Sequence, residues 1–160
     1  MTKVKLAKWL LIFVAFVAVA NIAIDYYRNY PMEHFSCESN FETKLDDKTI
    51  SGIISFMFNN GKGQVKGSFN LIENGNKVAK VNRIFDFNYT RSGNSYLLVS
   101  KDPYNTKYTA FIRALLPDFY LLENSGLQLE IYRQNASGYV FVRADTTIIY
   151  CDQDTPIAPR

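Results

Sequence analysis

Hydrophobic residues follow two different patterns along the chain, and each pattern predicts its own kind of structure. Trp9 to Ile24 is an apolar run without a charged residue. At about 1.5 Å per residue, a helix over this run nearly spans a hydrocarbon core of roughly 30 Å, and Leu6 and Tyr26-Tyr27 complete the length. From about residue 35 onward, apolar and polar residues alternate in short segments, which is typical of half-buried β-strands.

Turn residues separate the alternating segments, and Asn-Gly steps such as Asn60-Gly61 and Asn74-Gly75 are strong hairpin signals. The predicted strands have their apolar positions within Phe35–Phe41, Ile50–Phe58, Val65–Leu71, Ala79–Tyr89, Tyr96–Val99, Leu127–Ile131, Tyr139–Phe141 and Ile148–Tyr150. Thr106–Leu116 has the spacing of one short helix, which Pro117 would end. The chain is therefore expected to be mainly β, with an N-terminal transmembrane helix followed by a small antiparallel β-barrel or sandwich.

The predicted organisation has five parts. Residues 1–8 form a cytoplasmic N-terminus, 9–27 a transmembrane anchor, 28–34 a linker, 35–152 a periplasmic β domain and 153–160 a loose tail. Lys3, Lys5 and Lys8 precede the apolar run, and the positive-inside rule keeps them in the cytoplasm. In a bacterium, the chain would then be a single-pass protein of the inner membrane with its C-terminal domain in the periplasm.

A cleaved signal peptide is the alternative interpretation of the apolar run. It requires a basic start, an apolar middle and a small-x-small cleavage site, which Ala18-Val19-Ala20 supplies. The retained anchor is favoured because apolar character resumes at Ile22–Ile24 and an aromatic-basic boundary follows at Tyr26–Arg28. Both interpretations export the β domain.

Charge and cysteine content narrow the choice of function. The first 28 residues carry a net charge of +3 and the remainder is neutral, so a nucleic-acid-binding surface is not expected. Cys37 and Cys151 stand near the two ends of the β domain. In an oxidising compartment such a pair usually forms a disulfide, although two separate buried thiols remain the alternative. With one histidine, His34, the chain lacks the spacing of a metal site, and no cofactor is expected.

Catalytic chemistry is not expected either. The single histidine lies beside the anchor, and the chain contains no G-x-S-x-G turn that would carry a nucleophile. His34 is instead a candidate pH sensor, since histidine changes charge in the physiological range. That hypothesis predicts that His34→Gln removes acid dependence of signalling.

Aromatic residues at inward positions of the predicted strands allow two interpretations. They are Phe56, Phe58, Phe69, Phe85, Phe87, Tyr96, Phe141 and Tyr150. Together they form either a filled core or the wall of an apolar pocket for a lipid-like small molecule.

The general plan resembles the ToxS-like and FidL-like accessory proteins of Gram-negative bacteria. These have a short lysine-bearing N-terminus, one anchor and a β-rich exported domain with a cysteine near each end. In size and layout the chain is most similar to the PsaF/MyfF proteins encoded beside fimbrial operons. The segments Leu116–Tyr120 and Gly138–Phe141, followed by Cys151, resemble the C-terminal half of FidL-like chains.

The resemblance implies a protein partner. ToxS-like proteins associate in the periplasm with a single-span, ToxR-like regulator whose cytoplasmic domain binds DNA, and they stabilise or activate it. Some related pairs form a lipocalin-like barrel between the two chains. The resemblance implies regulation of virulence or fimbrial genes, a structural bridge between Cys37 and Cys151, and no catalytic residues. The alternative function is a lipocalin-like periplasmic binding module for an apolar ligand such as a bile salt or fatty acid.

Overall fold

The computed structural model describes residues 2–153, which divide into two compact units at Glu33 and His34. The predicted tail from 153 to 160 lies, apart from Gln153, outside the described residues. The two units are a long helix and a β-barrel, and each is described by itself. The predicted fold class is confirmed, with a barrel rather than a sandwich.

The first unit is a single helix, α1 (Thr2–Glu33). Its segment Lys8–Glu33 is long and apolar enough to cross a membrane, a property that anchors and signal sequences share. The helix does not end at Tyr27 but includes most of the segment predicted as a linker. Asn21, the strongly polar residue within the apolar run, donates a hydrogen bond from Nδ2 to the Val17 carbonyl oxygen at 2.8 Å. Its donor is therefore satisfied inside the helix.

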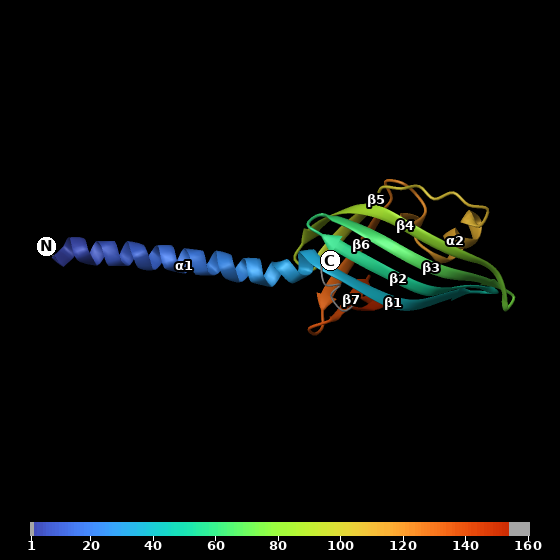
Figure 1. The fold of residues 1–160 in the computed structure, drawn as a ribbon, viewed down its shortest axis with the longest axis horizontal. Coiled ribbons are helices and arrows are strands. Elements are labelled where there is room, and N and C mark those ends of the chain that lie inside the picture. The colour runs from blue at the N-terminus through green and yellow to red at the C-terminus, as the bar shows by residue number, and fades with distance from the viewer. Residues whose placement is uncertain (1, 154–160) are drawn as a thin grey trace, which may run out of the picture. The chain divides into compact units, whose positions relative to one another are not determined.

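The second unit is a closed barrel in which the described residues form eight strands, each antiparallel to the next (Figure 1). The strands are β1 (His34–Leu45), β2 (Lys48–Asn59), β3 (Lys62–Glu73), β4 (Asn76–Ser92), β5 (Ser95–Ser100), β6 (Gly126–Arg133), β7 (Gly138–Arg143) and β8 (Thr146–Asp152). The order along the chain equals the order around the barrel. This up-and-down arrangement needs only short turns between most strands.

Two-residue turns set the register of the hairpins. Asn60 and Gly61 both have positive φ, at 46° and 81°, and Asn74 and Gly75 repeat the pattern at 52° and 76°. This is the turn that matches the right-handed twist of paired strands, and asparagine and glycine tolerate it best. The hairpin signals in the sequence are therefore local conformational preferences that the barrel retains.

The barrel interior is filled by aromatic rings. Phe58 is fully buried near the centre of this cluster. Its ring centroid lies 5.3 Å from Phe87, 5.6 Å from Tyr96 and 6.2 Å from Phe141, each in an edge-to-face arrangement. Edge-to-face pairs place the positive ring edge against the negative ring face, which adds to the stabilisation from burial. The strands are consequently held around a packed core.

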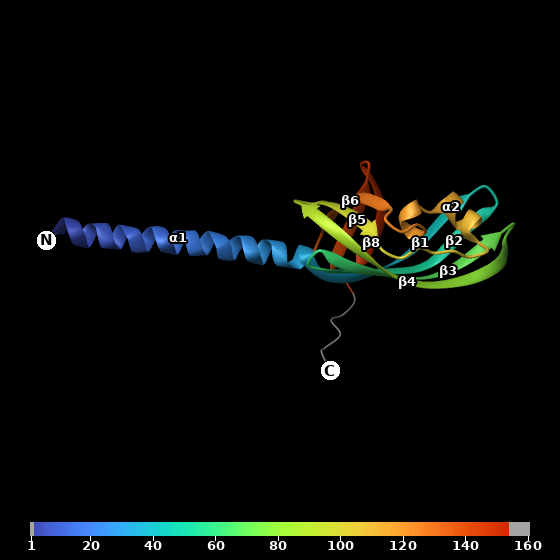
Figure 2. The same cartoon turned by 90° about the horizontal axis from the view of Figure 1, so that it is seen from above.

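One long excursion, between β5 and β6, departs from the hairpin pattern. It contains α2 (Thr109–Leu115), shorter than the predicted helix, and the 3-10 turn η1 (Asp118–Tyr120). Figures 1 and 2 show α2 at one end of the barrel, where it contacts β1 and β2. Phe119 inserts into the core, with its ring centroid 5.5 Å from Phe85 and 5.9 Å from Phe87. The excursion is thus part of the folded barrel.

Arg83 fastens this excursion to β4. Its guanidinium donates hydrogen bonds to the carbonyl oxygens of Tyr120 and of Asp102, the latter at 2.7 Å. The same group lies over the rings of Phe85 and Tyr104, at 4.4 and 4.5 Å from their centroids. Burial lowers the pKa of Arg83, and Tyr104 and Asp102 partly counter that effect. The arginine side chain still stays charged at physiological pH, so the two hydrogen bonds from Arg83 are charge-assisted.

The inward direction predicted for Tyr150 is wrong. The side chain is 45% exposed and points out of the barrel, whereas its neighbour Cys151 is fully buried. Successive residues of a strand face opposite sides, so only one of the two can face the core. The apolar side chain on the inner face before Cys151 is Ile149, and not Ile148.

Candidate functional site

The barrel closes at a seam between β1 and β8 that differs from its other joints. β1 and β2 pair along twelve positions, but among the described residues β1 and β8 pair only at Glu38 and Asp152. Beyond that pair, Asn40–Leu45 of β1 and Thr146–Tyr150 of β8 have no ladder between them. We use the name seam for this junction of β1 and β8, which is paired at Glu38 and Asp152 and open beyond that pair. Its edges are strand edges with backbone groups that lack the bonds a sheet normally supplies.

The backbone direction along β1 follows from its hairpin with β2. Leu45 and Lys48 flank a two-residue turn and therefore exchange backbone hydrogen bonds. Every second residue counted back from Leu45 also forms backbone hydrogen bonds with β2. The intervening residues Asn40, Glu42 and Lys44 direct their N–H and C=O groups away from β2, into the seam. Glu38 belongs to the same alternating set of residues as Asn40, Glu42 and Lys44, and its pairing with β8 agrees with this direction.

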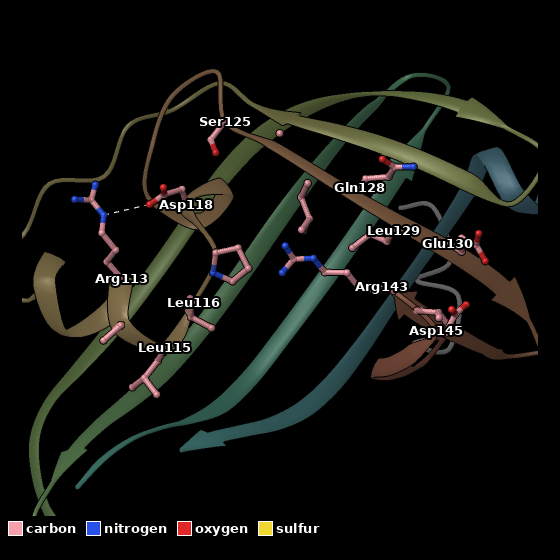
Figure 3. Close-up of a pocket in the computed structure, with 16 residues that line it drawn as sticks. Arg113, Leu115, Leu116, Asp118, Ser125, Gln128, Leu129, Glu130, Arg143 and Asp145 are labelled. Carbon is pink, nitrogen blue, oxygen red and sulfur yellow. Dashed lines mark hydrogen bonds and ion pairs between the residues drawn. The ribbon is translucent and has the colours of Figure 1, made fainter. Parts of the chain in front are cut away.

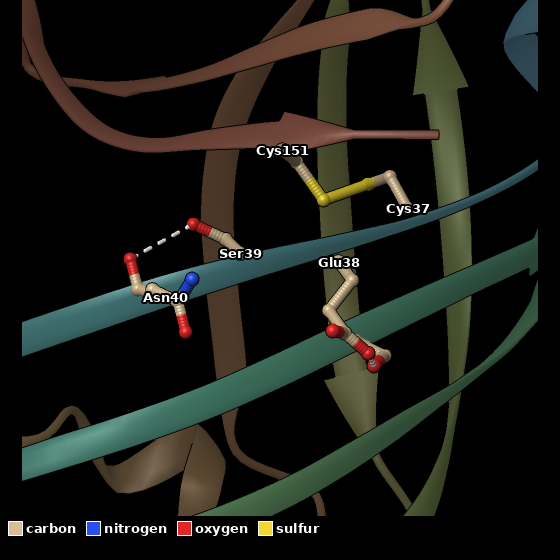
Figure 4. The surroundings of a disulfide bond; sticks show 6 residues. Cys37, Glu38, Ser39, Asn40 and Cys151 are labelled. Carbon is tan, nitrogen blue, oxygen red and sulfur yellow. Dashed lines mark hydrogen bonds between the residues drawn. A yellow bond between two sulfur atoms is a disulfide. The ribbon is translucent and has the colours of Figure 1, made fainter. Parts of the chain in front are cut away.

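The disulfide between Cys37 and Cys151 lies directly beside the single pair that closes the seam (Figure 4). The two Cα atoms are 5.4 Å apart, and both side chains are fully buried. The bridge joins residues separated by 114 positions. In the chain-entropy model a loop of that length contributes about 4–5 kcal/mol. The bond thus supplies a closure that the short ladder alone provides weakly.

An apolar pocket lies beside the seam. It encloses about 300 Å³ between the last part of β1, the start of β8 and the residues that follow α2. Its wall includes Phe41, Ile54, Leu116, Leu127, Ile149 and the buried Tyr120. Burial raises the pKa of the Tyr120 hydroxyl, so this group is neutral at physiological pH. The charged side chains in the wall of this pocket are Glu42 and Arg143.

A larger and more polar cleft adjoins this pocket (Figure 3). It has a volume of about 940 Å³ and lies between the end of α2, the start of β6 and the β7–β8 turn. Arg113 Nε and Asp118 Oδ1 form an ion pair of 3.1 Å on one side of it. Arg143 belongs to the wall of both hollows. An amphipathic molecule would find an apolar and a polar compartment side by side here.

The predicted aromatic positions and the observed hollows do not coincide. Seven of the predicted residues are buried: Phe56, Phe58, Phe69, Phe85, Phe87, Tyr96 and Phe141. None of the eight, Tyr150 included, lines the apolar pocket or the polar cleft. The aromatic side chains fill the core instead, and the hollows lie toward the end of the barrel that carries α2. Sequence reasoning missed Leu116, Leu127 and Arg143, because nothing in their local pattern distinguishes a pocket wall from a core.

His34 is the first residue of β1 and is partly exposed. Its role as a pH sensor stays a prediction. Within residues 2–153, no group of three histidine, cysteine, aspartate or glutamate side chains is arranged to hold a metal ion.

The fold and the site together define a class: an eight-stranded antiparallel barrel domain, closed by a disulfide and preceded in the chain by an apolar helix. A family model, the YqeJ C-terminal domain, matches residues 34–151. The chain belongs to this family, and the match begins at the first residue of β1 and ends at the second cysteine. No curated protein and no solved structure matches the chain.

Proposed function

We propose that the chain is an inner-membrane-anchored periplasmic accessory protein that binds a ToxR-like, single-span regulator and stabilises or activates it. Two features support its location. The apolar segment of α1 follows lysines that the positive-inside rule retains in the cytoplasm. The disulfide between Cys37 and Cys151 suits an oxidising compartment such as the periplasm. The relationship to ToxS-like and FidL-like proteins, and the control of virulence or fimbrial genes, are part of this proposal.

The seam is the observation that carries the proposal. Unpaired strand edges bind extended segments of other chains, because each added strand supplies the missing backbone hydrogen bonds. The edge of β1 from Asn40 to Leu45 is long enough for such an addition. The edge also borders an apolar pocket, which would receive alternate side chains of the added strand. We therefore propose that a strand of the regulator's periplasmic domain pairs with β1 at the seam.

Replacement of Glu42 by proline tests this pairing. Proline removes a backbone N–H that faces the seam and leaves the bonds between β1 and β2 in place, as edge strands allow. Glu42→Ala changes only the side chain and serves as the matched control. We expect recovery of the regulator with the full-length protein from membranes to fall about tenfold for Glu42→Pro, the equivalent of about 1.4 kcal/mol, and to be unchanged for Glu42→Ala.

Asn40→Pro repeats the test at a second seam-facing position. Thermal unfolding of each variant verifies that the barrel is intact. Undiminished recovery with both proline variants would show that the seam is not the contact. Recovery of the wild-type protein with no single-span regulator would overturn the proposed function itself.

A further inference from the structure

The apolar pocket and the polar cleft meet along one shared wall. The residues common to both are Leu115, Leu116, Pro117, Leu127 and Arg143. Four of these five are apolar, and the fifth carries a positive charge at the boundary between the two hollows. A ligand that occupied both compartments would have its apolar part on one side of this wall and its polar part on the other.

The size of the apolar pocket limits the kind of hydrophobic group that it accepts. Its volume is about 300 Å³. At about 30 Å³ for each small group in a liquid, that space holds roughly ten methylene-sized groups. Phe41, Ile54 and Ile149 contribute side chains to its walls. A hydrocarbon chain of about ten carbons fits this volume, whereas the larger fused-ring body of a steroid exceeds it.

Arg143 is placed to receive an anionic group. Figure 3 shows its guanidinium extending across the hollow toward Leu116, while Glu130 and Asp145 lie on the opposite side of it. Among residues 2–153 no hydrogen bond or ion pair engages this guanidinium, in contrast to Arg113, which is paired with Asp118. Arginine binds a carboxylate through two parallel hydrogen bonds. Glu130 and Asp145 at the rim of the cleft, together with Glu42 in the wall of the apolar pocket, repel a dianion such as a phosphate monoester more strongly than a single carboxylate.

We propose that this site binds a medium-chain, unbranched carboxylate of about ten carbons. The hydrocarbon chain occupies the apolar pocket, and the carboxylate pairs with Arg143. This inference goes beyond the proposed function: the ligand would occupy the apolar pocket when no added strand fills it, and its binding can be measured without a regulator. The site differs from the one expected inside the aromatic core, because the core rings are in contact with one another and the apolar pocket is lined by other residues.

Photocrosslinking of the full-length protein in lipid nanodiscs tests the site. The probe is decanoic acid with a diazirine near the end of its chain, and crosslinked peptides are identified by mass spectrometry. We expect labelling of peptides that contain Phe41, Ile54 or Ile149, beyond the background of α1 in the bilayer. Arg143→Gln should raise the probe concentration for half-maximal labelling about tenfold or more, whereas Arg143→Lys should retain most of the binding.

Two further measurements separate the alternatives. An uncharged decanol probe should label these peptides weakly in the wild-type protein and equally weakly in Arg143→Gln. Taurocholate, a steroid carrying a negative charge, should compete poorly for the site. Labelling confined to α1, equal labelling by both probes, or labelling unchanged in Arg143→Gln would overturn the inference. Because Arg143 is exposed, the variant is expected to fold, and its thermal unfolding curve checks this.

Discussion

At the residue scale, single polar groups decide how the excursion between β5 and β6 is attached. Arg83 donates to the partly buried carbonyl oxygen of Tyr120 and to the exposed carbonyl oxygen of Asp102. Removing one partner of such bonds costs more than the bonds themselves contribute, since the acceptors stay behind unpaired. Tyr120, one of the residues that Arg83 holds, is buried beside the apolar pocket. The stability of the barrel and the shape of the pocket thus depend on the same small group of residues.

Replacement of Arg83 by methionine should reveal this dependence. The substitution keeps the aliphatic length but leaves the carbonyls of Tyr120 and Asp102 without their donor. We expect the free energy of unfolding in urea to fall by about 1–3 kcal/mol. Lys80→Met changes an exposed cation on the same strand and should be nearly neutral. Equal effects of the two substitutions would show that Arg83 does not fasten the excursion.

The buried Tyr120 hydroxyl predicts how the free energy of unfolding changes at alkaline pH. Its pKa is raised by burial above the ordinary value of about 10, so folding favours the protonated hydroxyl. The contribution of this group is fully present below pH 10. It is lost as pH rises further, because the unfolded chain deprotonates first. One such group gives a slope of about 1.4 kcal/mol per pH unit.

The matching experiment follows urea unfolding between pH 9 and 12. Tyr120→Phe retains the ring but removes the titrating hydroxyl. The slope should therefore fall by up to about 1.4 kcal/mol per pH unit, the contribution of one group. An identical slope in the wild-type protein and the variant would mean that the hydroxyl ionises as freely in the barrel as in the unfolded chain.

At the element scale, the strands of the barrel depend on glycine where two backbones or a ring approach closely. A Cβ atom added to Gly52 of β2 would lie 2.1 Å from the carbonyl oxygen of Ser68 on β3. At Gly67, the corresponding space is occupied by the Phe69 ring. Curved barrel strands commonly need such positions, because a bend brings neighbouring chains closer than a side chain permits.

Gly52→Ala should therefore destabilise the barrel. The neighbouring atom belongs to the backbone of a paired strand and has little room to move, so we expect a loss of about 1–3 kcal/mol in the free energy of unfolding. Gly126→Ala is the control, since its new Cβ would meet only ordinary contacts, the nearest at 3.7 Å. A loss at Gly126 as large as that at Gly52 would contradict the steric explanation.

At the scale of the whole molecule, the barrel is a meander whose first and last strands are joined by one ladder pair and one disulfide. The other joints involve ladders of at least four residue pairs. This asymmetry means that the barrel has a defined place at which it can open. The proposed strand addition and the apolar pocket both lie along that place.

Replacement of Cys37 and Cys151 together by alanine tests the closure. We expect the free energy of unfolding to fall by about 3–5 kcal/mol. Amide hydrogen exchange should rise first in β1 and β8, and later in β3 and β4, which pair along their length. A uniform rise across all strands would show that the disulfide stabilises the barrel as a whole and does not specifically close the seam.

Much of the fold could be predicted from local patterns in the sequence. The apolar run specifies α1, and alternation together with Asn60-Gly61 and Asn74-Gly75 specifies hairpins. Both signals involve residues within a few positions of each other, where side-chain direction and turn conformation are fixed by short-range sterics. The aromatic residues of the core were recognisable for the same reason, apart from Tyr150.

The candidate site could not be predicted in this way, because it is made where distant elements meet. Whether β1 and β8 pair along their length or only at Glu38 and Asp152 depends on the combined twist and stagger of the whole barrel. The apolar pocket arises from the end of α2 facing the seam, and Arg143 acquires its place from the β7–β8 turn. The sequence by itself determined which faces are apolar, and only the tertiary structure decided where those faces fail to close.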